Sequence, residues 1–360
     1  MEQSQFITFI RKWFVATLAI IIEKINGSTT APNYMFEQLL RREYSITGMW
    51  NTEQFDDVLV AADYVALDSS LPLKSRPSMG AFGGKIPKMG IEKQKNEQEI
   101  QDLQTMQSQN VPETTIARKM FDDTRKVIGG IKERNEASFL LGLSSGVTSV
   151  QDDDKPGAAV RIDYGYKNEN KFGVPVLWSN PASTPLSDIN TRILAKASVD
   201  GKVVNKIYVD LATITNILKT QEAANLYALS MGNFGTTKPA PSLQKLNDVV
   251  RTEYGYEFVK VDRSVTIEDK AGNRSTFKPW KPGAVAATTS DIVGSLFHAT
   301  VAESGARVAG VEYQEVDEYM LVSLFRLNRP SLQEVTNAQA RVAPVIGTTV
   351  YTMDSLTVAA

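Results

Sequence analysis

The chain has no cysteine and only one histidine, His298, among its 360 residues. Without cysteine it can form no disulfide and no thiolate metal site, and it has no cysteine nucleophile. A single histidine removes most metal and acid–base schemes that rely on imidazole groups. The net charge of −2 predicts no global attraction to nucleic acid or to an anionic membrane. The absence of cysteine fits assembly in a reducing cytoplasm.

A long hydrophobic run is also missing. The most apolar stretch, residues 13–22 (WFVATLAIII), follows Arg11 and Lys12 and is about half the ~20 residues that a membrane span needs. Glu23 and Lys24 come directly after it, without the small-residue pattern of a signal-peptide cleavage site. We therefore expect an N-terminal helix packed on protein, with no signal peptide and no membrane span.

What is present is the composition of a folded protein, with 42% apolar and 22% charged residues, and enough chain for one large or two ordinary domains. Apolar spacing predicts a mixed α+β chain. Helices are expected over residues 36–44, 112–141, 211–229 and 243–254. Strands are expected over residues 159–164, 207–209, 256–261, 311–327 and 338–358, with a hairpin over 265–277.

The segment from Leu67 to Gln101 stands out because it has too few apolar side chains to form a buried core of its own. Its few apolar side chains are spread among lysines, prolines and glycines, and Gly80, Gly83 and Gly84 cluster near its middle. Such a long irregular segment is uncommon inside a compact domain. Two extended arms of ~12 residues would reach on the order of 40 Å. We interpret the segment as an arm that lies on a neighbouring copy, with Gly80 to Gly84 at its tip.

The helix over residues 112–141 has the strongest pattern in the chain. Pro112 suits a first helical turn, since its missing N–H would be unpaired there anyway. A continuous helix of ~30 residues would be about 45 Å long. Gly129 and Gly130 lie in its interior, where glycine weakens a helix and can allow a bend.

Three motifs with catalytic or ligand-binding associations are weak. Gly142 to Gly146 matches a nucleophile elbow centred on Ser144, but a helix precedes it where that motif needs a strand. Gly80 to Lys85 is one residue short of a phosphate-binding loop, and Ile86 stands where it needs serine or threonine. Asp152 to Asp154 lack the glycine and distal glutamate of a calcium loop. We expect no catalytic residue, cofactor or metal.

Four stretches carry a resemblance to a known family: VAADYVALDSSLPLKSRP, over residues 60–77, with GGKIPKMG, over 83–90; ARKMFDDTRKVIGGIKERNEASFLLGLSSGVTSV, over 117–150; VRIDYGYKNENKFGVPVLWSNPASTPLSDI, over 160–189; and QARVAPVIGTTVYTMDSLTV, over 339–358. In this order they resemble the lambda-type family of tailed-bacteriophage major capsid proteins, called phage major capsid protein E. Each motif is short, and the ordered set is more specific than any one of them.

The resemblance implies an α+β Hong Kong 97-type capsid fold. It would comprise an N-terminal arm (1–60), an extended loop hairpin (61–105), a peripheral domain with a long spine helix and a long sheet (106–185), an inserted axial domain (186–310), and a return to the peripheral domain (311–360). Copies would form hexamers and pentamers of an icosahedral shell around double-stranded DNA, assembled in the bacterial host's cytoplasm. Portal, scaffold and decoration proteins are the other partners that the likeness implies.

Within that reading, six apolar side chains of the extended loop would contact the adjacent subunit, and Gly129 and Gly130 would form a hinge in the spine helix. The six are Leu71, Leu73, Phe82, Ile86, Met89 and Ile91. Some relatives cross-link a loop lysine to an asparagine; Lys85 or Lys88 with Asn337 would be the candidates here, and the lambda-type likeness argues against it. Two alternatives stay open: an encapsulin-like compartment enclosing an enzyme, and a serine hydrolase built on Ser144.

Overall fold

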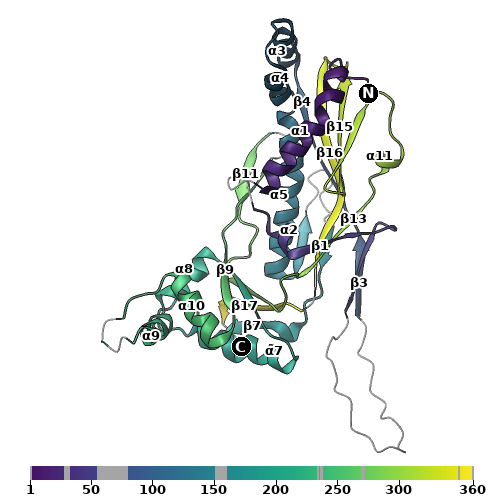
Figure 1. The fold of residues 1–360 in the computed structure, drawn as a ribbon. Helices are drawn as coiled ribbons and strands as arrows, with labels where there is room; N and C mark the ends of the chain where they lie inside the picture. Colours follow the sequence, from purple (N-terminus) through teal and green to yellow (C-terminus); the bar gives the residue numbers. More distant parts are fainter. Residues whose placement is uncertain are drawn as a thin grey trace, which may run out of the picture. The chain divides into compact units, whose positions relative to one another are not determined.

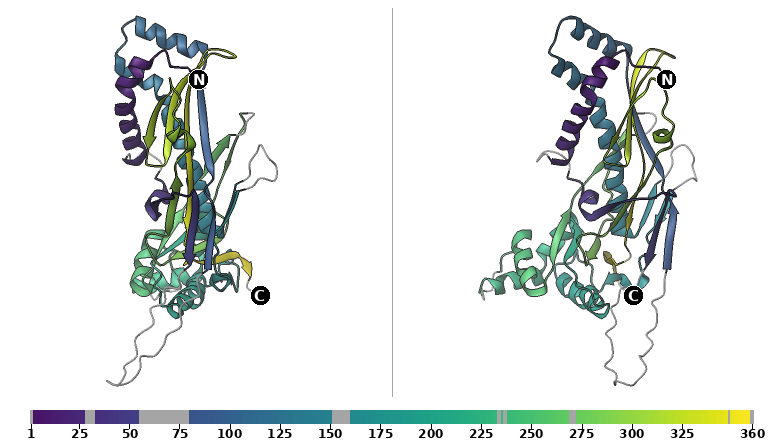
Figure 2. Two further views of the ribbon diagram at one scale, coloured as in Figure 1. Left: turned by 90° about the vertical axis from the view of Figure 1, so that its right-hand side faces the viewer. Right: turned by 45° about the vertical axis from the view of Figure 1, so that its right-hand side comes forward.

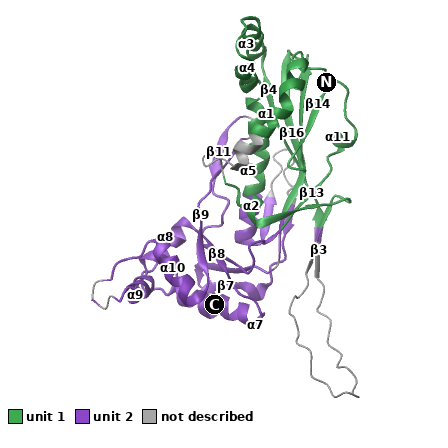
Figure 3. Ribbon diagram, in the orientation of Figure 1, with its two compact units in different colours: residues 1–50, 84–136, 295–344 green, residues 51–83, 137–294, 345–360 purple. Residues whose placement is uncertain are grey.

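Helices and strands are mixed along the whole chain, as the α+β prediction requires (Figure 1). The computed structural model describes residues 2–27, 33–54, 80–150, 160–232, 235, 238–268, 272–347 and 349–358. The chain divides into two compact units, each with its own sheet (Figure 3). Unit 1 comprises residues 1–50, 84–136 and 295–344, and unit 2 comprises residues 51–83, 137–294 and 345–360.

The sheet of unit 1 is organised around β16 (Gln333–Ile346), most of which is buried. Among the described residues the sheet has six strands, in the order β1-β13-β16-β15-β14, with β4 also paired to β16. Residues 88–95 and 320–327 both pair antiparallel with the same stretch of β16, one on each side. The other members are β1 (Leu40–Tyr44), β4 (Lys88–Lys95), β13 (Gly294–Ala299), β14 (Glu312–Val316) and β15 (Met320–Leu327).

Helices of unit 1 pack beside this sheet. The predicted N-terminal helix is α1 (Ile7–Gly27), which buries Phe9, Ile10, Phe14 and Leu18 and lies alongside α5 (Figures 1 and 2). No helix in the described part of the chain is long and apolar enough to cross a membrane. The remaining helices are α2 (Met35–Leu39), α3 (Glu97–Ser108), α4 (Glu113–Met120), α11 (Ala302–Gly305) and the start of α5 (Asp122–Ser145).

Two sequence predictions for unit 1 are wrong in extent. The helix expected over residues 36–44 ends at Leu39, and Leu40–Tyr44 is strand β1 because it pairs with β13. The segment expected to be irregular is regular over its second half: Gly80 to Gly84, expected at the tip, lie in β3 (80–85), which pairs with β2. Residues 88–95 form β4 and residues 97–108 form α3. Helix α3 begins with a capping box between Asn96 and Glu99, a local signal that the sequence carried.

The long helix is present but divided. α4 and α5 are separated at Phe121, whose ring is buried and stacks on Phe14 of α1 with centroids 5.7 Å apart. α5 then runs without interruption through Gly129 and Gly130 to Ser145. The break therefore lies eight residues before the glycine pair, at an aromatic contact with α1 that spacing alone does not reveal.

Unit 2 contains a mixed sheet in the order β7-β17-β12-β8-β9. Strands β17 and β8 pair antiparallel with β12, while β7 and β9 are parallel to their neighbours. Its strands are β7 (Lys171–Val174), β8 (Lys206–Asp210), β9 (Glu257–Val261), β12 (Ala284–Thr288) and β17 (Tyr351–Val358), and two hairpins accompany it, β5 (Val147–Val150) with β6 (Val160–Asp163) and β10 (Val265–Glu268) with β11 (Arg274–Phe277).

The core of unit 2 lies between this sheet and a group of helices, and it buries Trp178, Ile207, Ile214 and Val285. The predicted helix over 243–254 is confirmed as α10, begun by the Ser242 cap and ended by Gly255 at φ +82°. The helix predicted over 211–229 is two helices, because Thr220 caps a second start. The helical elements are η1 (Asn168–Asn170), α6 (Pro185–Asp188), the π-helix η2 (Ile189–Leu194), α7 (Ala195–Val199), α8 (Leu211–Lys219), α9 (Gln221–Ser230) and α10 (Leu243–Tyr254).

A buried ion cluster ties three segments of unit 1 together. The Nζ of Lys132 on α5 lies 2.8 Å from a carboxylate oxygen of Glu37 on α2 and 2.8 Å from one of Asp317, in the β14–β15 turn. The Lys132 side chain is 0% exposed. Asp317 and Glu318 both adopt positive φ, +51° and +68°, a conformation that costs energy in non-glycine residues. The ion pair with Lys132 helps to hold that turn.

We predict that Lys132→Met lowers the free energy of unfolding by about 3–5 kcal/mol, because it leaves two carboxylates without their buried countercharge. Urea denaturation measures the change. The matched control is Lys119→Met, which removes an exposed pair with Asp102 (3.3 Å) and should cost at most about 1 kcal/mol. Equal effects of the two substitutions would contradict the importance of the buried cluster.

His298 lies in β13, 6% exposed, against the rings of Tyr44 and Tyr319 at centroid distances of 5.5 and 6.3 Å. Burial lowers the pKa of His298 below its usual value of 6.5; the carboxylate of Glu318 opposes that shift and the guanidinium of Arg42 adds to it. The neutral imidazole is therefore the form that the fold favours.

This lowered pKa makes stability depend on pH. Between pH 6.5 and the lower folded-state pKa, the unfolded chain binds a proton at His298 that the folded chain does not. The free energy of unfolding therefore has its full value above pH 6.5 and falls as the pH drops toward the folded-state pKa. We expect the stability difference between the wild type and His298→Gln to shrink from about pH 7.5 to about pH 5. A difference that stays constant across this range in parallel urea titrations would contradict the assignment.

Candidate assembly site

The base of the extended arm is held by the sheet of unit 1. We call residues 45–50 and 84–87 the arm root. The N–H of Ser45 donates to the carbonyl of His298 in β13 (2.8 Å), and the N–H of Ile86 donates to the carbonyl of Gly48 (2.9 Å). Ile86 and Trp50 are buried, at 3% and 4% exposed. Strands β2 (Met49–Gln54) and β3 (Gly80–Lys85) leave the arm root as a pair.

Two glycines of the arm root lie close against side chains of unit 1. Gly48 has φ +69°, and a Cβ there would lie 2.4 Å from the guanidinium of Arg341 in β16. The same guanidinium donates to the Gly48 carbonyl at 3.4 Å. A Cβ on Gly84 would lie 3.0 Å from the indole nitrogen of Trp50. An isolated two-stranded hairpin is only marginally stable. The β2–β3 pair therefore depends on these contacts at its base, and they fix the position at which it leaves unit 1.

The six predicted contact residues fall into two groups. Ile86, Met89 and Ile91 belong to unit 1, where Ile86 is buried within its own chain and the other two are half-buried in β4, opposite Ala340 and Ala338. Leu71, Leu73 and the side chain of Phe82 lie outside the described residues. The first group therefore anchors the arm, and the expectation of a contact with a neighbouring copy now depends mainly on the second.

The candidate hinge lies inside α5. A Cβ on Gly129 would meet no described atom within 4 Å, whereas one on Gly130 would lie 2.9 Å from the Cδ1 of Ile91. Gly130 thus lets β4 approach the helix closely. A hinge motion at this pair stays a prediction.

The cross-linking candidate has one inaccessible member. Lys85 and Lys88 are exposed, but Asn337 is 8% exposed and its Oδ1 accepts a hydrogen bond from the hydroxyl of Ser323 at 2.8 Å. Asn337 also pairs with Glu92 and Ser323 in the sheet. The Asn337 side chain is therefore buried and hydrogen-bonded within its own chain, and the absence of a cross-link stays a prediction.

Two of the three motifs with catalytic or ligand-binding associations lie in ordinary secondary structure, and the third lies outside the described residues. Ser144 lies at the end of α5 and donates to the carbonyl of Leu140 at 2.9 Å, while it accepts from the N–H of Lys281 at 3.0 Å. The helix end continues into Gly146 at φ +78°, as the sequence indicated. Gly80 to Lys85 is strand β3, and Asp152 to Asp154 lie outside the described residues. Among the described residues no cluster of histidine and carboxylate groups suits a metal ion.

Comparison with solved structures identifies the fold. The chain is similar to a protein assigned as a prophage capsid protein of Escherichia coli CFT073, at 11% identity and TM-score 0.55, over 98% of this chain and 99% of that one. It is also similar to a phage-related protein of Bordetella bronchiseptica RB50, at 13% identity and TM-score 0.53, over 96% and 98% of the two chains. No protein-family model and no curated protein sequence matches it.

The chain therefore has the fold of these two phage proteins along its full length, and the predicted α+β capsid-type fold is confirmed. Membership of the lambda-type family stays a prediction, since no family model matches. At 11% and 13% identity the sequence likeness is weak, and the comparison establishes the fold alone.

The glycine pair of α5 provides a matched test of its local packing. We expect Gly129→Ala to raise the free energy of unfolding by up to about 1 kcal/mol, since alanine favours a helix over glycine. Gly130→Ala should gain less or lose stability, because its methyl group meets Ile91. Combining Gly130→Ala with Ile91→Val should show favourable coupling of about 0.5 kcal/mol or more. Identical effects of the two alanine substitutions in urea denaturation would rule out the close approach.

Proposed function

We propose that this chain is the major capsid protein of a tailed bacteriophage. In this role it forms hexamers and pentamers that close into an icosahedral shell around double-stranded DNA, and it is not an enzyme. The observation that carries the proposal is the full-length similarity to a protein assigned as a prophage capsid protein, over 98% of one chain and 99% of the other. Such coverage leaves no substantial part of the chain for a separate catalytic domain.

Each domain that the resemblance implies receives a role in this proposal. The peripheral domain comprises residues 106–185 and 311–360, with the α4–α5 spine and strands β14 to β16, and residues 186–310 form the axial domain at the capsomer centre. Large apolar side chains are exposed at or just beyond the ends of α7 and α9 in unit 2: Val199 is 81% exposed, Val203 73%, Leu229 62% and Met231 62%. Exposed apolar groups of this kind are suited to contacts between subunits.

The arm supplies avidity. Its root is anchored on β13 and β16, so the apolar residues beyond it, Leu71 and Leu73, can engage a neighbouring copy. A contact added through a tether strengthens an assembly without new chemistry at the primary interface. The net charge of −2 suits a shell whose contact with packaged DNA is not sequence-specific. Portal, scaffold and decoration proteins complete the proposed set of partners, and assembly takes place in the host cytoplasm.

The proposal is tested by expressing the chain in bacteria and examining the purified protein by sedimentation and electron microscopy. Closed shells built of hexamers and pentamers are expected. A protein that stays monomeric at high concentration and under crowding by polyethylene glycol would contradict the proposal. Particles isolated with an enzyme inside, rather than DNA, would favour the encapsulin-like alternative. Labelling of Ser144 by an active-site serine reagent would favour the hydrolase.

The arm's contribution is tested by Leu71→Asp with Leu73→Asp. These substitutions place charge on the residues proposed to become buried between copies, so shells should fail to form while the subunit keeps its unfolding midpoint. The matched control is Ser69→Asp with Ser70→Asp, which adds the same charge two and three positions earlier, at polar sites. Shells of normal yield and stability from the leucine variant would remove the arm from the assembly mechanism.

A further inference from the structure

The one histidine of the chain, His298, lies where the arm root meets the sheet of unit 1. Its carbonyl accepts the N–H of Ser45 at 2.8 Å, and its imidazole lies against the ring of Tyr44, with centroids 5.5 Å apart. The hydroxyl of Tyr44 is 2.7 Å from the hydroxyl of Thr300, two residues after His298. His298 therefore contacts the last residue of β1 through its side chain and the first residue of the arm root through its backbone.

The two aromatic neighbours of the imidazole differ in burial. Tyr319, in the β14–β15 turn, is 3% exposed and lies 6.3 Å from the imidazole between centroids, whereas Tyr44 is 55% exposed. An outward movement of Tyr44 would therefore bring water to His298 without leaving a void in the core, and the same movement of Tyr319 would not. The β1 side is where the buried imidazole can become hydrated.

Charged groups face the imidazole from β1 and from the β14–β15 turn. Burial lowers the pKa of His298 below 6.5; the carboxylate of Glu318 raises it, and the guanidinium of Arg42 lowers it further. Arg42 lies on β1, 5.9 Å from the ring centroid of Tyr319 and 3.7 Å from a carboxylate oxygen of Asp317. A charged imidazole would therefore lack water and would face a like charge on β1. The other ionisable members of this cluster are Lys132 of α5 and Glu37 of α2.

We propose that protonation of His298 opens the arm root. The neutral ring stays covered by Tyr44; when the ring gains a proton, water must reach it, because a buried charge is costly without solvent or a partner. Tyr44 then leaves the ring and Thr300, and residues 45–50 separate from β13. Every contact involved lies within one subunit, so this role of His298 does not rest on the shell function.

Hydrogen exchange of the full chain tests the proposed opening. Because opening takes up one proton, the protection of amides in residues 45–50 and 84–87 should fall by about tenfold for each pH unit below 6.5, down to the folded-state pKa. Protection is corrected for the intrinsic exchange rate. Amides of β16 exchange only when the sheet itself unfolds, so their protection should exceed that of the arm root at every pH.

Three substitutions test whether His298 is the group that titrates. His298→Gln should abolish the pH dependence at the arm root, even where it loosens the fold and shifts the protection by a constant factor. Arg42→Gln raises the pKa of His298 and should narrow the pH range over which protection falls. Glu318→Gln lowers that pKa and should widen the range. A purely structural role of His298 predicts neither of these opposite changes.

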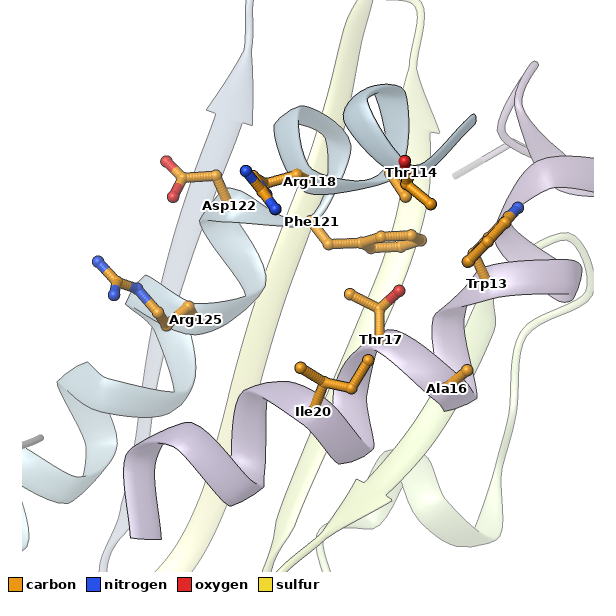
Figure 4. Close-up of a pocket in the computed structure, with 10 residues that line it drawn as sticks. Trp13, Ala16, Thr17, Ile20, Thr114, Arg118, Phe121, Asp122 and Arg125 are labelled. Carbon is orange, nitrogen blue, oxygen red and sulfur yellow. The ribbon is translucent and has the colours of Figure 1, made fainter. Parts of the chain in front are cut away.

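The matched control lies in a groove of about 600 Å³ between α1 and the α4–α5 junction (Figure 4). The ring of Phe121 is directed toward Thr17 and Trp13 of α1 there, and none of the residues around His298 lines the groove. Phe121, 1% exposed, is a packing residue without a titrating group. Phe121→Leu should lower the protection of α1 amides and leave the pH dependence at the arm root as it is in the wild type.

Three results would overturn the role of His298. They are wild-type protection at the arm root that does not change with pH, a pH dependence that survives His298→Gln, and arm-root protection equal to that of β16. In the last case the arm root would open only when the whole unit unfolds. Each of these leaves the capsid function standing, whereas failure of the wild type to form shells would overturn that function and leave the exchange measurements valid.

Discussion

The backbone of β16 is the constraint on which unit 1 depends. A buried strand of fourteen residues presents polar groups on both edges, and each needs a hydrogen-bond partner because no water reaches it. Strands β15 and β4 supply those partners along the same stretch, and β13 pairs with β16 as well. Residues near position 90, position 295 and position 325 must therefore meet at one strand. Small residues such as Ala338 and Ala340 allow them to do so.

Strand β16 and its neighbours also fix the positions of the arm root and of helix α5. Arg341 of β16 fixes Gly48, and His298 of β13 accepts from Ser45, so the arm leaves from a rigid edge of the sheet. Ile91 of β4 meets Gly130, which brings the helix α5 close to the same sheet. A shell protein needs tethers that start at defined points, because avidity depends on a linker whose geometry permits both contacts at once.

Local chemistry explains where sequence reasoning succeeded. Helix α10 has its serine cap and its terminal glycine in sequence, and the β10–β11 hairpin turns through Gly272 at φ +84°. Reasoning failed where a distant contact decided the outcome. Leu40–Tyr44 has helical apolar spacing but forms a strand because β13 lies beside it. The fully buried strand β12 (Ala284–Thr288) has no alternation, so its short apolar run gives no periodic signal.

By itself, the sequence determined the α+β class, the long helical segment and the poor case for an active site, because composition, spacing and turn residues are local properties. The tertiary structure decided which apolar residues of the arm are anchors, since Ile86 is buried in its own chain. It also decided where the helix breaks, at Phe121 against Phe14, and that Trp13, Ile20 and Phe121 share one groove. Those outcomes depend on contacts between residues far apart in the sequence, about 40 positions for Ile86 with Gly48 and about 110 for Phe14 with Phe121, and no local pattern encodes them.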